Sequence, residues 1–316
     1  MRKHRMFVLG AGLLALSLFA AACSDSGGDD DTGGSASANE SSAPKPELTV
    51  GVSGAFAENQ LVAEMYAQVL ENAGYTVSRE LDISDREVGN KALADGEIDL
   101  KPEYTGFDLP LYDKNAPTNG DPQAVADALS GAVADSGLVT YAISPANSTN
   151  VFVVLPDTAS ANNLTDMSSL AAVAPQMTLG APPDCPKADF CIPGLKDTYG
   201  IEFGEFKPLD FGGPKTVSAI DSGAVQVGEL FSLDPTITDK GYVVLTDNEN
   251  LQSNGNFVPV VREEVASEEL GALLDSVTTT LTDDNMREMV GQVVNDKRDV
   301  EDVASEYLTN AGIISS

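Results

Sequence analysis

The sequence predicts an α/β fold of two lobes, in which the second lobe is inserted into the first. Short apolar runs of strand length alternate with helical periodicity through most of the chain. One more apolar run, residues 257–261, is followed by helical periodicity only. A strand that returns late, before a helical tail, indicates that the chain leaves the first lobe and later rejoins it. We expect lobe 1 to comprise residues 47–146 and 256–316, and lobe 2 residues 147–255.

The first elements form a strand, a helix and a second strand. Residues 48–53 are apolar enough for a buried strand, and residues 61–73 carry apolar side chains at helical spacing until Gly74 ends the helix. Residues 76–81 form the next strand. A unit of this kind favours parallel strands. Ser84 and Glu87 then match a capping box for a helix that ends near Gly96.

The alternation continues after a strand at residues 97–100. Asp121 and Pro122 begin another helix, which Gly137 ends. Further strands are expected at residues 138–143, 151–155, 177–179, 225–230 and 243–245. After residue 262 the apolar periodicity predicts three amphipathic helices. The chain would cross between the lobes near residues 144–150 and 248–257.

The amino terminus predicts an export signal. Arg2, Lys3 and Arg5 precede an apolar run that ends in small residues just before Cys23. We interpret residues 1–22 as a signal peptide, and the junction resembles a bacterial lipobox, in which Cys23 is lipidated. An ordinary secretory signal beside a chance cysteine is the alternative. The protein would then lie at the outer face of the cytoplasmic membrane, held there through its lipid.

Residues 23–46 consist mainly of Gly, Ser, Asp, Ala and Pro. A segment with so few large apolar side chains cannot offset its ordering entropy, so we predict a disordered tether. The folded domain would comprise residues 47–316.

Composition excludes several classes of function. The single histidine, His4, lies in the signal segment, so the mature chain has none for nucleophile, zinc or acid/base chemistry. The mature chain has 15 basic and 49 acidic residues, a net charge of −34. Nucleic acid is therefore not an expected partner, because phosphate binding needs clustered Lys and Arg. We expect no cofactor, no metal and no catalytic residue.

Cys185 and Cys191 lie in a proline-rich segment. Outside the membrane two such cysteines form a disulfide most simply, and the chain-entropy model gives about 2.4 kcal/mol for a loop of this length. A metal site is the alternative, but it would have only two thiolates and no imidazole.

Several segments together resemble the extracytoplasmic binding proteins of ABC importers for glycine betaine, choline and related quaternary amines. The most specific is Pro-Glu-Tyr-Thr-Gly at residues 102–106; the others are at residues 53–60, 86–88, 185–200, 212–214, 230–235 and 256–262. The resemblance implies a type II periplasmic-binding-protein fold, with a hinge between lobes that close on the ligand. It also implies an ABC permease with its ATPase as partner.

A quaternary ammonium has no N–H donor, so aromatic faces would have to attract it. With no tryptophan in the chain, the cage must be built from Tyr and Phe. By position in the resemblance, the ligand-binding candidates are Tyr104, Thr105, Phe56 and Phe231, with Phe211, Phe107 and Tyr112 weaker. Donors for a betaine carboxylate would be Ser53, the Gly212–Pro214 turn with Thr216, and Thr149 and Asn150 at the first crossing.

We therefore predict a non-catalytic solute-binding lipoprotein that delivers a quaternary amine or zwitterion to an importer. Two other hypotheses stay open. One is a secreted hydrolase that uses two carboxylates, since acidic residues are abundant. The other is a ligand-sensing lipoprotein with no role in transport.

Overall fold

The computed structural model describes residues 45–54 and 56–315. The predicted signal peptide, Cys23 and nearly all of the predicted tether lie outside these residues. The last part of that tether, Lys45 and Pro46, is described. The Lys45 ammonium is 2.5 Å from a carboxylate oxygen of Glu269 and 4.4 Å from the ring centroid of Tyr75.

The first sheet has the strand order β2-β1-β3-β10-β4. β1 pairs in parallel with β2 and β3, as the βαβ pattern predicts, whereas β10 is antiparallel to β3 and β4. The sheet is therefore mixed and not all parallel, because β10 enters it from the opposite end after the chain has built the second sheet. The bounds are β1 Glu47–Ser53, β2 Thr76–Ile83, β3 Leu100–Tyr104, β4 Leu138–Thr140 and β10 Phe257–Arg262.

The second sheet has the order β7-β6-β8-β5-β9. Again three neighbouring strands, β7, β6 and β8, pair in parallel, and the strand that arrives from the other sheet, β5, is antiparallel to both of its neighbours. β5 and β10 thus take equivalent places in two sheets of the same order. The bounds are β5 Asn150–Val154, β6 Thr178–Ala181, β7 Glu205–Pro208, β8 Val227–Phe231 and β9 Val243–Leu245.

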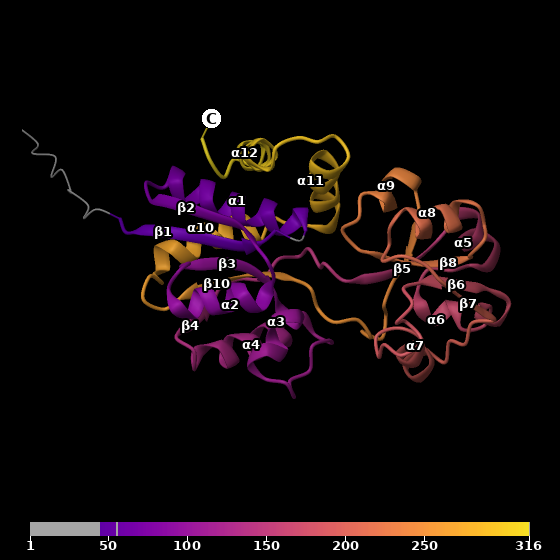
Figure 1. Cartoon of the computed structure of the whole chain (residues 1–316). Helices are drawn as coiled ribbons and strands as arrows, with labels where there is room; N and C mark the ends of the chain where they lie inside the picture. Colours follow the sequence, from indigo (N-terminus) through magenta and orange to yellow (C-terminus); the bar gives the residue numbers. More distant parts are fainter. Residues whose placement is uncertain (1–44, 55, 316) are drawn as a thin grey trace, which may run out of the picture. The chain divides into compact units, whose positions relative to one another are not determined.

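Helices cover both faces of the first sheet (Figure 1). α1 (Ala57–Asn72) shares a buried apolar cluster with α10 (Glu268–Thr278), α11 (Asp283–Val294) and α12 (Val300–Asn310). α2 (Arg86–Asp95), α3 (Thr105–Tyr112) and α4 (Pro122–Ala134) contribute to a second cluster with β10. The three C-terminal helices are where the periodicity predicts them.

Local signals fix several helix ends. Gly96 takes a left-handed conformation, φ 76°, at the end of α2, and Asp121 caps α4 by accepting a hydrogen bond from the Ala124 N–H. The predicted Ser84 cap of α2 is wrong by one residue. Asp85 is the N-cap, because its carboxylate accepts the hydrogen bond of the Val88 N–H at 2.9 Å.

Shorter helices connect the strands of the second sheet. They are α5 Pro156–Asn162, α6 Met167–Leu170, the 3₁₀ turn η1 Ala174–Gln176, α7 Ile192–Tyr199, α8 Pro214–Asp221 and α9 Thr236–Lys240. Most are too short to show a full apolar period.

The two segments that connect the sheets bond to each other. Asn147 pairs with Asn256 in an isolated antiparallel bridge, and the Ser148 N–H donates to the Gly255 carbonyl at 3.0 Å. The hydroxyl of Thr149 donates to the Ser253 carbonyl at 2.9 Å. The crossings therefore lie close to where the sequence predicts them, and they form the kind of paired connection about which lobes can hinge.

Candidate ligand-binding site

A cavity of about 820 Å³ is lined by residues attached to both sheets and by the first crossing segment. This size lies within the range of small-molecule sites. The residues that carry its chemistry are Phe56, Glu58, Arg86, Tyr104, Phe107, Ser148, Thr149, Asn150, Phe231 and Asp234. The cavity therefore combines aromatic rings with charges of both signs.

Two phenylalanines, one at the start of a helix and one at the end of a strand, meet across this cavity. Phe56 is the N-cap of α1, and Phe231 is the last residue of β8. Their ring centroids are 6.3 Å apart in an edge-to-face arrangement. Both residues are exposed, Phe56 at 50% and Phe231 at 38% of their accessible surface. They are therefore free to contact a ligand from both sides of the cavity.

Tyr104 is packed more like a core residue than the sequence predicts. Only 6% of it is exposed, its ring centroid lies 4.9 Å from that of Phe257, and its hydroxyl donates to Asn59. The guanidinium carbon of Arg86 lies 5.7 Å from the Tyr104 centroid and 6.0 Å from that of Phe107. The rings of Tyr104 and Phe107 therefore already have a cation of the protein, the Arg86 guanidinium, beside them.

Arg86 is held in place by an acidic partner. Its Nε donates to a carboxylate oxygen of Glu103 at 2.8 Å, and Lys101 contacts the other oxygen at 2.7 Å. Burial alone would raise the pKa of Glu103, but the charges of Lys101 and Arg86 hold it below its usual value. Glu103 therefore stays ionised and neutralises part of the positive charge of Arg86.

Glu58 is the buried acid of the cavity wall. Burial raises its pKa, and the nearby charge of Asp234 acts in the same direction. Its carboxylate is 3.4 Å from the Tyr104 hydroxyl, which donates its proton to Asn59, and 3.5 Å from the Ser148 hydroxyl, which donates to it. Together with Asp234, it makes this part of the cavity favourable for a cation.

The structure brings five of the eight predicted ligand-binding residues to the cavity: Phe56, Tyr104, Thr149, Asn150 and Phe231. Thr105 is fully buried, and its hydroxyl donates to the Asn254 carbonyl at 3.2 Å. Ser53 lies beside a neighbouring pocket of about 200 Å³.

Of the weaker candidates, Phe107 and the Gly212–Pro214 turn line the cavity. Tyr112 lines a different pocket. Thr216 is buried and bonds to Asp210.

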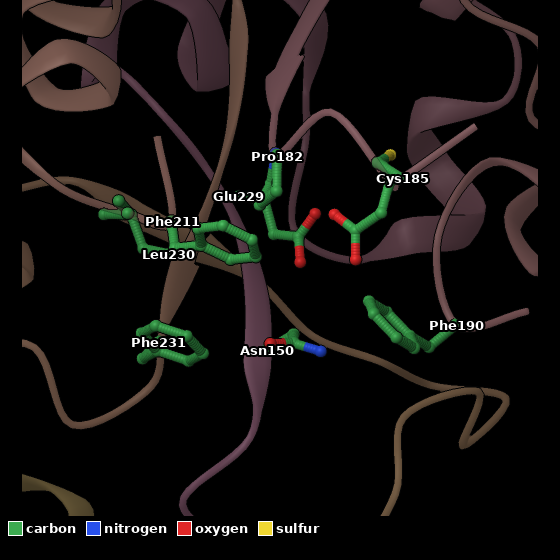
Figure 2. A pocket seen from close by; sticks show the side chains of 10 residues that line it. Asn150, Pro182, Cys185, Phe190, Phe211, Glu229, Leu230 and Phe231 are labelled. Carbon is green, nitrogen blue, oxygen red and sulfur yellow. The ribbon is translucent and has the colours of Figure 1, made fainter. Parts of the chain in front are cut away.

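A second, smaller pocket of about 170 Å³ opens beside Phe231 (Figure 2). It shares Asn150, Gly212 and Phe231 with the large cavity. Its other lining residues include Phe211, predicted as a ligand contact, and three that the sequence reasoning missed, Asp184, Phe190 and Glu229. Glu229 could have been noticed, since it is a lone carboxylate within an otherwise apolar strand.

A disulfide shapes the wall of this smaller pocket. Cys185 and Cys191 are joined, with their Cα atoms 5.2 Å apart. Their sulfurs lie close to a carboxylate oxygen of Glu229, a grouping that could hold a metal only if the thiols were free. In the disulfide neither sulfur is a thiolate, so Glu229 is the one ionisable ligand left in this group.

The comparison with known proteins decides the family. A family model described as the substrate-binding domain of ABC-type glycine betaine transport systems matches residues 46–310. The chain belongs to this family. The family predicted from the sequence is thus confirmed, and it is a transport family, not an enzyme family.

Relatives of this family agree in fold. The glycine betaine-binding protein YehZ of Escherichia coli K12 is 24% identical over 267 residues, covering 81% of this chain and 88% of YehZ. The solved structure of apo YehZ superposes with a TM-score of 0.73 at 23% identity, over 86% of this chain and all of that one. A structure described as a glycine betaine/carnitine/choline ABC transporter gives a TM-score of 0.78 at 20% identity, over 84% and 99% of the two chains. The predicted type II periplasmic-binding-protein fold is confirmed.

Within residues 45–54 and 56–315, each helix is too short or too polar to cross a bilayer.

Proposed function

We propose that this protein is the extracytoplasmic, lipid-anchored substrate-binding component of an ABC importer, and that it binds glycine betaine, choline or a related quaternary amine. The supporting observation is the pair of accessible rings, Phe56 and Phe231, which approach to 6.3 Å across a cavity lined from both sheets. Aromatic faces are the natural partners of a cation that cannot donate a hydrogen bond.

Residues from both lobes line the cavity, so a ligand bound there would contact both. Glu58 and Phe56 belong to α1 or its N-cap, whereas Phe231 and Asp234 follow β8. A ligand that contacts both groups would stabilise an arrangement in which they lie close together. The permease and its ATPase would then accept the solute from the liganded form.

The proposal is tested by isothermal titration calorimetry with choline, glycine betaine, carnitine and neutral sugars. Quaternary amines should bind and sugars should not. Phe56→Leu and Phe231→Leu should each weaken binding by about 2- to 30-fold, the range of one cation–π contact. Phe203→Leu is the matched control, because Phe203 packs against the apolar cluster of the second sheet, away from the cavity.

Binding of sugars or amino acids alone would refute the quaternary-amine assignment. Equal effects of all three Phe→Leu substitutions would show that the losses come from folding and not from ligand contact. Uptake of radiolabelled choline by a strain lacking this gene separates import from sensing. If uptake is unchanged although the purified protein binds choline, the protein senses and does not import.

A further inference from the structure

Helix α11 contacts a segment that belongs to the second sheet. Its residues Arg287, Gly291 and Asn295 are four apart, so they lie along one face of the helix and its C-terminal end. Residues 232–239, which follow β8, lie along this face. α11 itself follows β10 and shares the buried apolar cluster of the first sheet. The two sheets are therefore joined at a place other than the two crossings.

Two hydrogen bonds hold the segment near the ends of this face. The Arg287 Nε donates to the Ser232 carbonyl at 2.6 Å, and the Arg287 side chain is only 13% exposed. The Asn295 side-chain amide donates to a carboxylate oxygen of Asp239 at 3.2 Å, at the surface. A hydrogen bond from a charged and mostly buried donor is stronger than one between exposed groups. Arg287 therefore makes the main polar contact.

Apolar contacts fill the space between these bonds. Leu233 is 3% exposed and belongs to the apolar cluster of the first sheet, to which α11 also contributes, although the segment follows a strand of the second sheet. A Cβ added at Gly291 would lie 3.3 Å from the Cβ of Pro235. The helix backbone therefore approaches the segment closely, and a large side chain at position 291 would push the segment away.

The same segment positions part of the wall of the large cavity. Phe231, directly before it, and Asp234, within it, line the cavity, as do Val290 and Val294 of α11. The contact between α11 and the segment thus lies at an edge of the cavity. While the segment is held there, the ring centroid of Phe231 lies 6.3 Å from that of Phe56.

α11 also begins at the connection between the sheets. A carboxylate oxygen of Asp283, its first residue, accepts the hydrogen bond of the Asn147 N–H at 2.9 Å, and Asn147 lies in the first crossing. At 1.5 Å per residue, Asn295 lies about 18 Å further along the helix. A rotation about the crossings that widens the cavity therefore moves the chain little at Asp283, and it draws the far part of the segment away from α11.

We propose that α11 is a clasp: its contacts with residues 232–239 hold the cavity narrow before a ligand binds, and they break when the cavity opens. The apparent affinity for a ligand of the closed form is proportional to the fraction of the protein that is closed. A clasp that raises this fraction raises the affinity. The effect on affinity rests on the proposed function, whereas the effect on the distance between the two sheets does not.

Spin-label distances in the free protein test the clasp directly. The mature chain with Cys23→Ser takes labels at Val88→Cys and Lys215→Cys, two exposed positions on α2 and α8, whose first residues line the cavity. Arg287→Gln should lengthen the mean distance between the labels by more than about 2 Å. In unlabelled chains the same substitution should weaken choline binding by up to about tenfold, measured by calorimetry.

A second variant separates opening from damage to the helix. Leucine favours a helix more than glycine does, so Gly291→Leu should preserve the helical circular dichroism while its side chain displaces Pro235 and lengthens the label distance. Arg298→Gln is the matched control for Arg287→Gln, because Arg298 pairs with Glu306 of α12 and not with the segment. It should change neither the label distance nor the affinity for choline.

Each outcome bears on a different part of the proposal. If neither Arg287→Gln nor Gly291→Leu lengthens the label distance, α11 is not a clasp, whatever the ligand is. If both lengthen it but bind choline as tightly as the parent chain, the clasp does not set the affinity. If no quaternary amine binds any of the chains, the proposed function is wrong, and the label distances alone decide whether the clasp exists. Return of both variants to the parent distance in saturating choline would show that ligand and clasp stabilise the same closed form.

Discussion

The carboxyl group of Glu229 has an environment that differs sharply from that of Glu103, although both are nearly buried. Burial and the charge of Asp184 raise the pKa of Glu229 to about 7. Glu103 lies between Lys101 and Arg86, so its pKa falls despite burial. Two acids of similar burial therefore differ in charge state near neutral pH, because only one has cations beside it.

The raised pKa predicts how the effect of Glu229 on the free energy of unfolding changes with pH. Its pKa is raised on folding from 4.5 to about 7, so the ionised group destabilises the folded state fully above pH 7 and not at all well below pH 4.5. Glu229→Gln should therefore raise the free energy of unfolding at pH 8 by up to about 3 kcal/mol, and by less at pH 5. Urea denaturation at the two pH values measures this.

The control for this experiment is Asp157→Asn, whose site is exposed. Its effect on the urea midpoint should be small and the same at both pH values. A gain for Glu229→Gln that does not grow between pH 5 and pH 8 would contradict the raised pKa.

Helix α3 shows how an element can depend on contacts that no local pattern reveals. It starts at Thr105, directly after β3, without an intervening turn. The Gly106 N–H donates to the Asn254 carbonyl at 2.7 Å, so the second crossing segment holds the helix start. A Cβ at Gly106 would lie 2.3 Å from the Thr118 carbonyl oxygen and 2.7 Å from that of Asn254. Only glycine permits this approach of three backbone segments.

Two glycine substitutions should therefore act in opposite directions. Gly106→Ala should lower the free energy of unfolding by about 1–3 kcal/mol, since the neighbouring atoms are backbone and cannot move aside. Gly131→Ala, in α4, should raise it by up to about 1 kcal/mol, because a Cβ there would meet nothing within 4 Å. Urea denaturation of both variants checks this. Stabilisation by Gly106→Ala would show that the close approach is not maintained in solution.

At the scale of the whole molecule, two sheets of one strand order are joined by a pair of bonded crossings. β5 and β10, the strands that follow the crossings, sit in equivalent positions. Asn150, the first residue of β5, lines both the large cavity and the smaller pocket. The connection between the sheets is therefore also part of the ligand-binding surface.

Membrane attachment is also a property of the whole molecule, and it is predicted at Cys23. Replacement of Cys23 by Ser should move the protein from the membrane fraction to the medium or periplasm, because a lipidated cysteine supplies the acyl chains that hold the domain. Fractionation followed by immunoblotting measures this. Cys185→Ser is the control, since it removes a cysteine remote from the predicted lipobox. Retention of the Cys23→Ser protein in membranes would refute the anchor.

The sequence by itself determined the family, the alternation of strands and helices and the late return of the chain at residues 257–261. It also indicated Phe56, Tyr104 and Phe231 as candidate ligand contacts. These features are local patterns or motifs, and a single chain displays them. The tertiary structure decided what local patterns cannot contain. It placed Arg86 against Tyr104, buried Thr105 and gathered Asp184, Phe190, Phe211 and Glu229 from separate segments around one pocket. Burial and charge pairing depend on residues far apart in the chain, so only the folded molecule shows which buried carboxylate has cations beside it.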